Sequence, residues 1–142
     1  MTDIAPPFIS RQRIHFDMLD MLGVLHNAHY LLLFERARFD FWHAQGLQIG
    51  APGLDWPYYV ARNEINYRAP ITRIQEVTVT LQVTHLGRSS ATLGHAVYQD
   101  DGTLAAEGHT TLVRVDPKTR RAIPWSGEFR ALLARYLIAT ER

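Results

Sequence analysis

The sequence predicts an α+β fold in which one antiparallel β-sheet wraps around a single long, buried helix. Two observations carry this prediction. Residues 27–46 have apolar side chains around most of a helical circumference, and residues 58–115 contain four strand-like runs separated by short breaks. Short connections favour antiparallel neighbours, because parallel strands need long crossovers. We therefore expect the four runs to form an antiparallel meander that packs on the helix.

The buried helix is expected to begin after Asn27 and to end at Gly46. One apolar face follows the 4-3-4-3 spacing of a helix, with Tyr30, Phe34, Ala37, Phe41 and Ala44. Asn27 is a favourable N-cap, because its side chain can accept a free backbone N–H of the first turn. Gly46 tolerates the left-handed conformation that often follows a helix.

The remaining elements follow from alternation and turn residues. Residues 8–16 alternate as a strand on a sheet edge, and residues 17–26 form a loop around Gly23. The four expected strands are 58–68, 76–86, 90–99 and 103–115, and "DDG" at 100–102 predicts the hairpin turn between the last two. Residues 46–57 read as a loop. Ser126 is the expected cap of a short C-terminal helix whose apolar face is Phe129, Leu132, Leu133, Tyr136 and Leu137.

Length and composition exclude several classes of protein. The 142 residues suit a single domain over 1–142, and the net charge of +1 does not suggest nucleic-acid binding. There are no cysteines, which excludes disulfides, thiolate metal sites and a cysteine nucleophile. No apolar run approaches the roughly 18 residues of a membrane span, and the N-terminal residues do not read as a secretory signal. We expect a cytoplasmic protein.

Residues 17–42 carry an ordered motif. An aspartate, Asp20, is followed after two residues by Gly23, then by His26 and Asn27, and by Tyr30 seven positions after the glycine. This pattern resembles the hotdog-fold acyl-CoA thioesterases of the 4-hydroxybenzoyl-CoA thioesterase type. Further segments are similar to that family in the same order, namely "YLLLFERAR" (30–38), "VARNEINYRAP" (60–70), "THLGRSS" (84–90), "DGTLAAEGHTTLVRVD" (101–116) and "AIP" (122–124).

The resemblance covers about residues 8 to 137 and implies a hotdog fold that hydrolyses acyl-CoA or aryl-CoA thioesters without a metal or redox cofactor. It implies that Asp20 is the nucleophile or the general base, and that a backbone N–H near Asn27 polarises the thioester carbonyl. His26 would orient the substrate or a water, or else it is a solvated loop histidine. The alternative for Asp20 is an ordinary turn aspartate bonded to its own backbone. Many relatives carry a second acidic residue two positions earlier, where this chain has Met18, so only a mechanism built on Asp20 alone is expected.

Other residues are candidates for substrate binding or have alternative roles. The expected substrate-binding residues are Gly23, Tyr30, Arg88, Ser89 and Ser90, where Arg88 suits a phosphate of coenzyme A or is a solvated turn residue. Glu35 is an alternative acid or base, or else pairs with Arg38 at i+3. Glu64 is expected at a subunit contact or in solvent. Aromatic residues that can line the acyl end of the pocket, or simply fill the core, are Trp42, Trp56, Tyr58 and Tyr59.

Metal binding is not expected. His26 and His29 have the i, i+3 spacing of two ligands, but there is no cysteine and no HExxH motif.

Three functional hypotheses remain open on the sequence. The first is a thioesterase that forms a homodimer, or a dimer of dimers, because the resemblance places the site at a subunit contact and a hotdog monomer leaves a strand edge open. The second is a non-catalytic hotdog protein that binds acyl-CoA as a sensor or carrier partner. The third is a dehydratase or hydratase on the same fold, which needs a base poised over a C–H bond.

Overall fold

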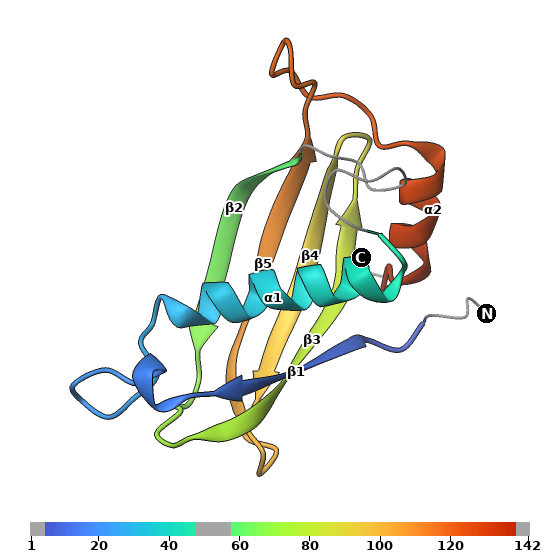
Figure 1. Ribbon diagram of the computed structural model, residues 1–142. Coiled ribbons are helices and arrows are strands. Elements are labelled where there is room, and N and C mark those ends of the chain that lie inside the picture. The colour runs from blue at the N-terminus through green and yellow to red at the C-terminus, as the bar shows by residue number, and fades with distance from the viewer. Residues whose placement is uncertain (1–4, 48–57, 139–142) are drawn as a thin grey trace.

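The computed structural model describes residues 5–47 and 58–138. The elements, in chain order, are β1 (Phe8–Ile14), the short 3₁₀ turn η1 (Phe16–Met18), α1 (His29–Ala44), β2 (Tyr58–Tyr67), β3 (Gln75–Leu86), β4 (Ser90–Tyr98), β5 (Leu104–Arg114) and α2 (Gly127–Arg135). Figure 1 shows one curved antiparallel sheet with α1 lying across its concave face and α2 beside the C-terminal end of α1. The predicted α+β hotdog arrangement is confirmed.

The strand order is β1-β3-β4-β5-β2. The predicted meander is therefore correct for β3, β4 and β5 but wrong for β2, which pairs with β5 and not with β3. The sequence prediction assumed that a short connection joins neighbours. Residues 68–74 are nevertheless long enough to pass the ends of β5 and β4, because seven extended residues reach roughly 23 Å and three strand spacings need about 14 Å.

Helix α1 contributes to two core clusters. The first core cluster packs Tyr30, Leu33, Phe34 and Ala37 of α1 on one half of the sheet, with Ile14, Met18, Leu25, Ile71, Val77, Val79, Val97, Ala105 and Ala106. The second core cluster packs Phe41 and Trp42 on the other half, with Tyr58, Leu81, Val83, Ala91, Leu93, Leu112, Trp125, Phe129 and Leu133. Helix α2 belongs to the second cluster only.

The helix ends agree with the prediction at two of the three positions that it named. Helix α1 ends at Ala44, and Gly46 adopts a φ of +76°. The side chain of Ser126 accepts the Phe129 N–H at 3.3 Å and caps α2. The prediction that Asn27 caps α1 is wrong, because the N-cap is Ala28, which has helical backbone angles and no side-chain cap.

The two edge strands differ in coverage. In β1 buried and exposed residues alternate, whereas almost every residue of β2 is exposed, including Tyr59, Val60 and Tyr67. Strand β2 approaches β5 so closely that a Cβ atom at Gly108 would collide with the Glu64 carbonyl oxygen. In the described ranges, no helix is long and apolar enough to cross a membrane.

Candidate active site

A cleft of about 250 Å³ opens at the N-terminal end of α1. One side is the loop that leads into the helix, and the other is the end of β2 with the residues that follow it. The lining residues are Val24, Leu25, Asn27, Tyr30, Tyr67, Arg68, Ala69 and Pro70. The walls are largely apolar, and a few polar groups converge on the helix start, as is typical of small-molecule sites.

The two sides of the cleft are tied together by hydrogen bonds and ring contacts. The Tyr67 hydroxyl donates to the Asn27 carbonyl at 3.1 Å, and the Tyr30 and Tyr67 rings meet edge to face at 5.2 Å. The Leu25 N–H donates to the Ile71 carbonyl at 2.8 Å. Burial raises the pKa of Tyr30, against the opposing effect of a backbone hydrogen bond with Ile71. Its hydroxyl is therefore neutral at physiological pH.

Asp20 closes a tight loop beside this cleft. Its N–H donates to the Val24 carbonyl at 2.8 Å, and its own carbonyl accepts the Gly23 N–H at 2.9 Å. Gly23 has a φ of +78°, which glycine adopts without strain. One carboxylate oxygen, Oδ1, accepts the N–H groups of Leu22 at 2.8 Å and Val24 at 3.4 Å. The turn-aspartate alternative therefore describes Oδ1. Asp20 is not among the lining residues of the cleft.

A free backbone donor lies immediately before the first turn of α1. The Ala28 N–H donates to His26 Nδ1 at 3.1 Å, and the His29 N–H donates to the His26 carbonyl at 2.9 Å. The Asn27 N–H has no acceptor anywhere in residues 5–47 and 58–138. It lies at the positive end of the helix dipole, on a residue that lines the cleft. Since Nδ1 of His26 is an acceptor, a neutral His26 carries its proton on Nε2.

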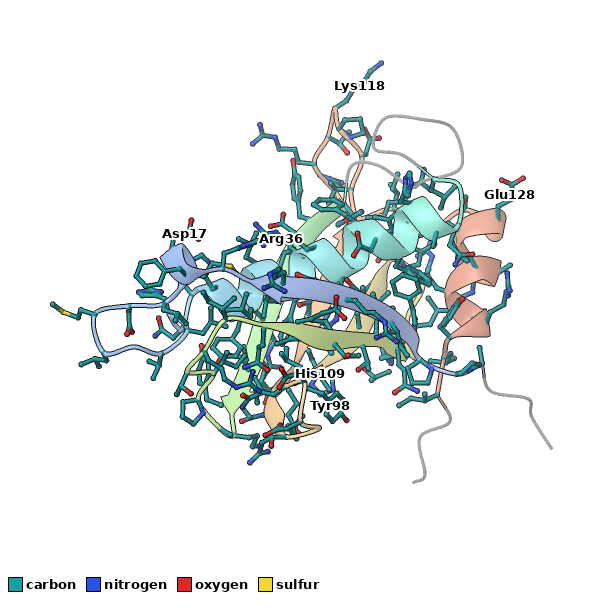
Figure 2. The ribbon with its side chains drawn as sticks, turned by 60° about the horizontal axis from the view of Figure 1, so that its bottom comes forward. Asp17, Arg36, Tyr98, His109, Lys118 and Glu128 are labelled. Atoms are coloured by element: carbon teal, nitrogen blue, oxygen red, sulfur yellow. The ribbon has the colours of Figure 1, made fainter. Side chains whose placement is uncertain are left out.

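The second acidic group expected from the family pattern is missing near Asp20. Met18 is buried, and its sulfur accepts the His15 N–H at 3.2 Å. Asp17 is exposed and its side chain points outward from η1 (Figure 2). Any chemistry at this loop therefore rests on Asp20 alone.

The predicted pairing of Glu35 with Arg38 is wrong. Arg38 is only 6% exposed and no ion pair of the described residues includes it. It shares the buried face of α1 with Phe34 and Phe41, and its guanidinium donates to Thr110 Oγ1 in a long contact of 3.4 Å. Burial lowers the pKa of Arg38. Glu35 itself is exposed, and its charge acts on Arg38 without an ion pair between the two side chains.

His95 is a buried polar residue that the sequence did not single out. Its ring stacks on Phe34 at 4.6 Å, and Nδ1 lies 3.1 Å from the Thr80 carbonyl, to which it donates. Burial, together with the nearby charge of Arg38, lowers the pKa of His95 to about 3. This imidazole is therefore neutral and belongs to the core.

Arg88, Ser89 and Ser90 lie at the β3–β4 turn, at the opposite end of the sheet from the Asp20 loop (Figure 1). The length of β3, about 35 Å, separates the two regions. The Ser89 carbonyl accepts the Arg114 N–H at 2.8 Å, so this turn also has a structural role. A single chain does not bring these residues to Asp20.

The other predicted site residues divide into core, surface and undescribed positions. Trp42 and Tyr58 are core residues joined by a 3.1 Å hydrogen bond, whereas Tyr59 and Glu64 are exposed on β2. Trp56 lies outside the described residues. The rings of His26 and His29 are 6.2 Å apart, and the described ranges contain no group of three or more residues suited to a metal ion.

Sequence reasoning missed one wall of the cleft. Tyr67, Arg68, Ala69 and Pro70 line it, but in the sequence they were only part of a strand that ends at a proline. The signal available was the resemblance of "VARNEINYRAP" to a family segment, because a strand end beside a helix start is a common place for a site.

Comparisons with known proteins show the family and the fold. The chain is 30% identical over 122 residues to the long-chain acyl-CoA thioesterase FadM of Escherichia coli, which covers 81% of this chain and 88% of the relative. A predicted thioesterase from Bacillus stearothermophilus has the same fold, with a TM-score of 0.83, 21% identity and coverage of 96% and 100% of the two chains. A Staphylococcus aureus protein solved in complex with CoA also has a TM-score of 0.83, with 19% identity and coverage of 100% and 92%. The family model of the thioesterase-like superfamily matches residues 14–133, and the chain belongs to that superfamily.

Proposed function

We propose that this protein hydrolyses acyl-CoA or aryl-CoA thioesters to the free acid and coenzyme A. The observation that carries the proposal is the free N–H of Asn27 at the start of α1, which opens into an apolar-walled cleft beside the Asp20 loop. Membership of the superfamily, the name of the Escherichia coli relative and the CoA complex of the Staphylococcus aureus structure support the same substrate class.

In the proposed reaction the thioester carbonyl oxygen accepts the Asn27 N–H, which stabilises the negative charge that develops when the carbonyl carbon is attacked. Asp20 supplies the attacking group. Its carboxylate either removes a proton from the water that attacks, or attacks directly to form an anhydride that water then hydrolyses. In both routes the C–S bond breaks and the coenzyme A sulfur leaves with the bond electrons and takes up a proton. Gly23 shapes the loop, and His26 and Tyr30 position the substrate.

We further propose that the working unit contains two copies of the chain, as a homodimer or a dimer of dimers. Strand β2 is a ten-residue free edge with exposed Tyr59, Val60 and Tyr67, which a second copy can cover by antiparallel pairing. A second copy is also the simplest source of Arg88, Ser89 and Ser90, because in one chain they lie a sheet length from Asp20. In the proposed dimer, these residues of one copy bind the phosphates or the pantetheine of the coenzyme A held in the site of the other copy.

The test is thiol release from a panel of acyl- and aryl-CoA thioesters, comparing the natural protein with Asp20→Asn. We expect the substitution to lower kcat by roughly 10²–10⁴-fold, the range for loss of a positioned acid–base group. The matched control is Asp17→Asn, three residues away and exposed, which should keep activity within about twofold. Normal turnover by Asp20→Asn would exclude Asp20 as the reacting carboxylate.

The second candidate function is acyl-CoA binding without turnover. It is favoured by one observation, the hydrogen bonds that hold Asp20 Oδ1 in its own loop. If the natural protein and Asp20→Asn both bind acyl-CoA and neither releases thiol, this candidate replaces hydrolysis. A cytoplasmic location stays a prediction from the sequence.

A further inference from the structure

We infer that Gln75 and Gln99 are positioning residues for the cleft. They form an amide clamp, defined here as the two side chains with the partners that they hold at the ends of β3 and β4. The inference rests on the proposed function, because the effect that it assigns to the clamp is on binding of a coenzyme A thioester.

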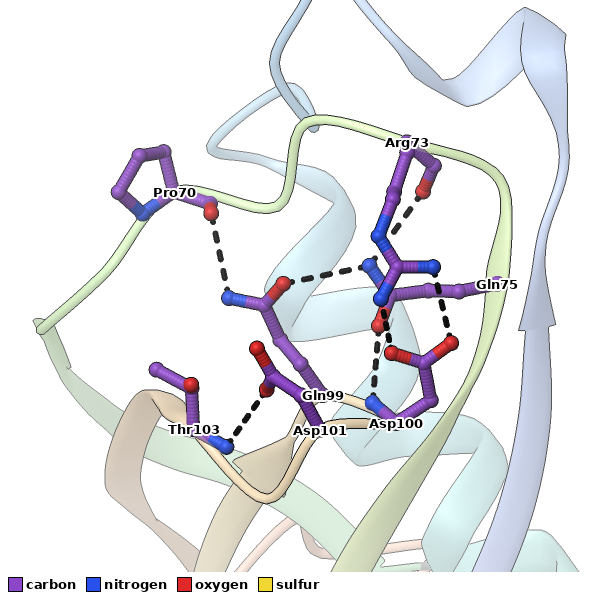
Figure 3. Close-up of polar contacts among 7 residues, drawn as sticks. All are labelled: Pro70, Arg73, Gln75, Gln99, Asp100, Asp101 and Thr103. Atoms are coloured by element: carbon purple, nitrogen blue, oxygen red, sulfur yellow. Dashed lines mark hydrogen bonds and ion pairs between the residues drawn. The ribbon is translucent and has the colours of Figure 1, made fainter.

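The clamp joins the β4–β5 turn to the segment that leads from β2 to β3 (Figure 3). Gln75 is only 3% exposed. Its Oε1 accepts the Asp100 N–H at 2.9 Å, and its Nε2 donates to Gln99 Oε1 at 3.2 Å. Gln99 uses its own Nε2 to donate to the Pro70 carbonyl at 3.2 Å. Both groups of both amides are therefore used. Gln75 is buried, whereas Gln99 is half-buried and its bond to Pro70 lies at the surface. A polar network in which every member is hydrogen-bonded favours one arrangement of its members.

An ion pair supports the same junction from outside. The guanidinium of Arg73 forms two hydrogen bonds with the Asp100 carboxylate, one of them at 2.9 Å between Nη1 and Oδ2. Both side chains are about half exposed, so solvent screens the pair and the amides are the more specific element. The turn itself is held by Asp101, whose carboxylate accepts the Thr103 N–H at 2.9 Å.

The clamped segment is a wall of the cleft. Arg68, Ala69 and Pro70 line it directly, and the next residue, Ile71, is fully buried in the first core cluster. The Ile71 carbonyl accepts the Leu25 N–H at 2.8 Å, and Leu25 lines the opposite wall. A shift of the Pro70 carbonyl would therefore move Pro70 in one wall. Through Ile71 it would also move Leu25 in the opposite wall. The clamp sets the width of the cleft without touching the substrate.

The test uses Gln99→Leu, which keeps the approximate side-chain volume and removes both amide contacts. The matched control is Gln82→Leu, the same change on β3 at a partly exposed glutamine that makes no side-chain hydrogen bond in the described residues. Gln99→Glu separates the two bonds of the clamp. It keeps an acceptor for Gln75 and loses the donor for Pro70, so it should behave like Gln99→Leu at neutral pH.

Two quantities are measured at 25 °C on protein shown to be folded. The first is hydrogen exchange of the Leu25 amide, which we expect to be about tenfold faster in Gln99→Leu and Gln99→Glu and unchanged in Gln82→Leu. The second is affinity for an S-alkyl thioether of coenzyme A, together with KM and kcat for the matching thioester. We expect a roughly tenfold weaker Kd and higher KM with kcat within about twofold, because loss of uniform binding raises KM alone.

The outcomes are distinguishable. Unchanged Leu25 exchange in Gln99→Leu would overturn the clamp, whatever the activity. Faster exchange with unchanged Kd and KM would show a local structural bond and overturn the positioning role. If the natural protein neither binds the thioether nor hydrolyses thioesters, the proposed function fails and the assigned ligand fails with it, while faster exchange would still support the mechanical link between Gln99 and Leu25.

Discussion

At its C-terminal end, α1 packs Phe41 and Trp42 into the second core cluster, and α2 lies over them with Phe129 and Leu133. At its N-terminal end, the same helix stops in a cleft, with a backbone N–H that has no acceptor in the described part of the chain. One helix therefore has a closed end and an open end. A helix can therefore be buried along its length and still leave the backbone at its start accessible, because the second core cluster covers only its C-terminal end.

The largest expected difference between the two ends is in stability. Phe129→Ala, at a fully buried position of the closed end, should lower the free energy of unfolding by about 3–5 kcal/mol. Phe16→Ala, at a position 78% exposed beside the open end, should change it by less than about 0.5 kcal/mol. Urea denaturation of both variants measures this. Equal losses would show that the open end is packed in solution.

The second prediction concerns the pH dependence of stability through His95. Its pKa is about 3 in the folded protein and about 6.5 in the unfolded chain, so below pH 6.5 only the unfolded chain binds this proton. The free energy of unfolding should then fall with decreasing pH by up to about 1.4 kcal/mol per unit, and level off near pH 3. Denaturation curves at pH 7 and pH 5 measure it.

His95→Leu should reduce that pH dependence, whereas His85→Leu, at an exposed position of β3, should leave it. The charges of Arg38 and His109 oppose protonation of His95, and neither changes in these variants. An unchanged slope in His95→Leu would mean that the buried imidazole is protonated in the folded state.

The third prediction concerns Arg38, which lies on α1 between the residues of the two core clusters. Its hydrogen-bond partners are the neutral hydroxyl groups of Thr110 and Tyr58, and no ion pair of the described residues includes it. A buried charge without a charged partner is expected to be less favourable than an apolar side chain of similar length. Arg38→Met should raise the free energy of unfolding by about 1–4 kcal/mol. Arg36→Met, on the exposed face two residues away, is the control and should be nearly neutral. A loss of stability in Arg38→Met would indicate that a partner satisfies this guanidinium in solution.

The smallest expected effect is at the two helix starts. Ser126→Ala removes a side-chain cap from α2 and should cost about 1 kcal/mol. Asn27→Ala removes a side chain that makes no hydrogen bond in the described ranges and leaves the backbone N–H in place, so it should change stability by less than about 0.5 kcal/mol and retain turnover. Thermal denaturation and thiol release measure both. A loss of about 1 kcal/mol in Asn27→Ala would restore Asn27 as a cap.

Most of the fold could be predicted because its signals are local. The alternation of β3, the "DDG" turn, Gly46 and the Ser126 cap each act within a few residues. The position of β2 could not be predicted, because the choice between β3 and β5 as its neighbour depends on residues about 40 to 56 positions away.

The candidate site was also predicted only in part, because only some of its residues are close together in the sequence. The Asp20 loop and the helix start are contiguous in the sequence, and the structure places them side by side. The wall formed by Tyr67 to Pro70 comes from another strand, so no local pattern indicated it. The burial of Arg38 was missed because an arginine three residues from a glutamate suggests a surface ion pair, although residues 34, 38 and 41 share a helical face.

The strand order also has a consequence for synthesis of the protein. Helix α1 is complete at residue 44, but the β3–β5 strands that bury it end at residue 114. Translation proceeds at about 5–20 residues per second, so roughly 4–14 s pass between the synthesis of this apolar helix and the synthesis of the last strand that buries it. Strands β3, β4 and β5 pair through short hairpins and can form at once, whereas β1 must find a partner some 60 to 73 residues later in the chain. We therefore expect the nascent N-terminal half to be the part of this protein that molecular chaperones bind.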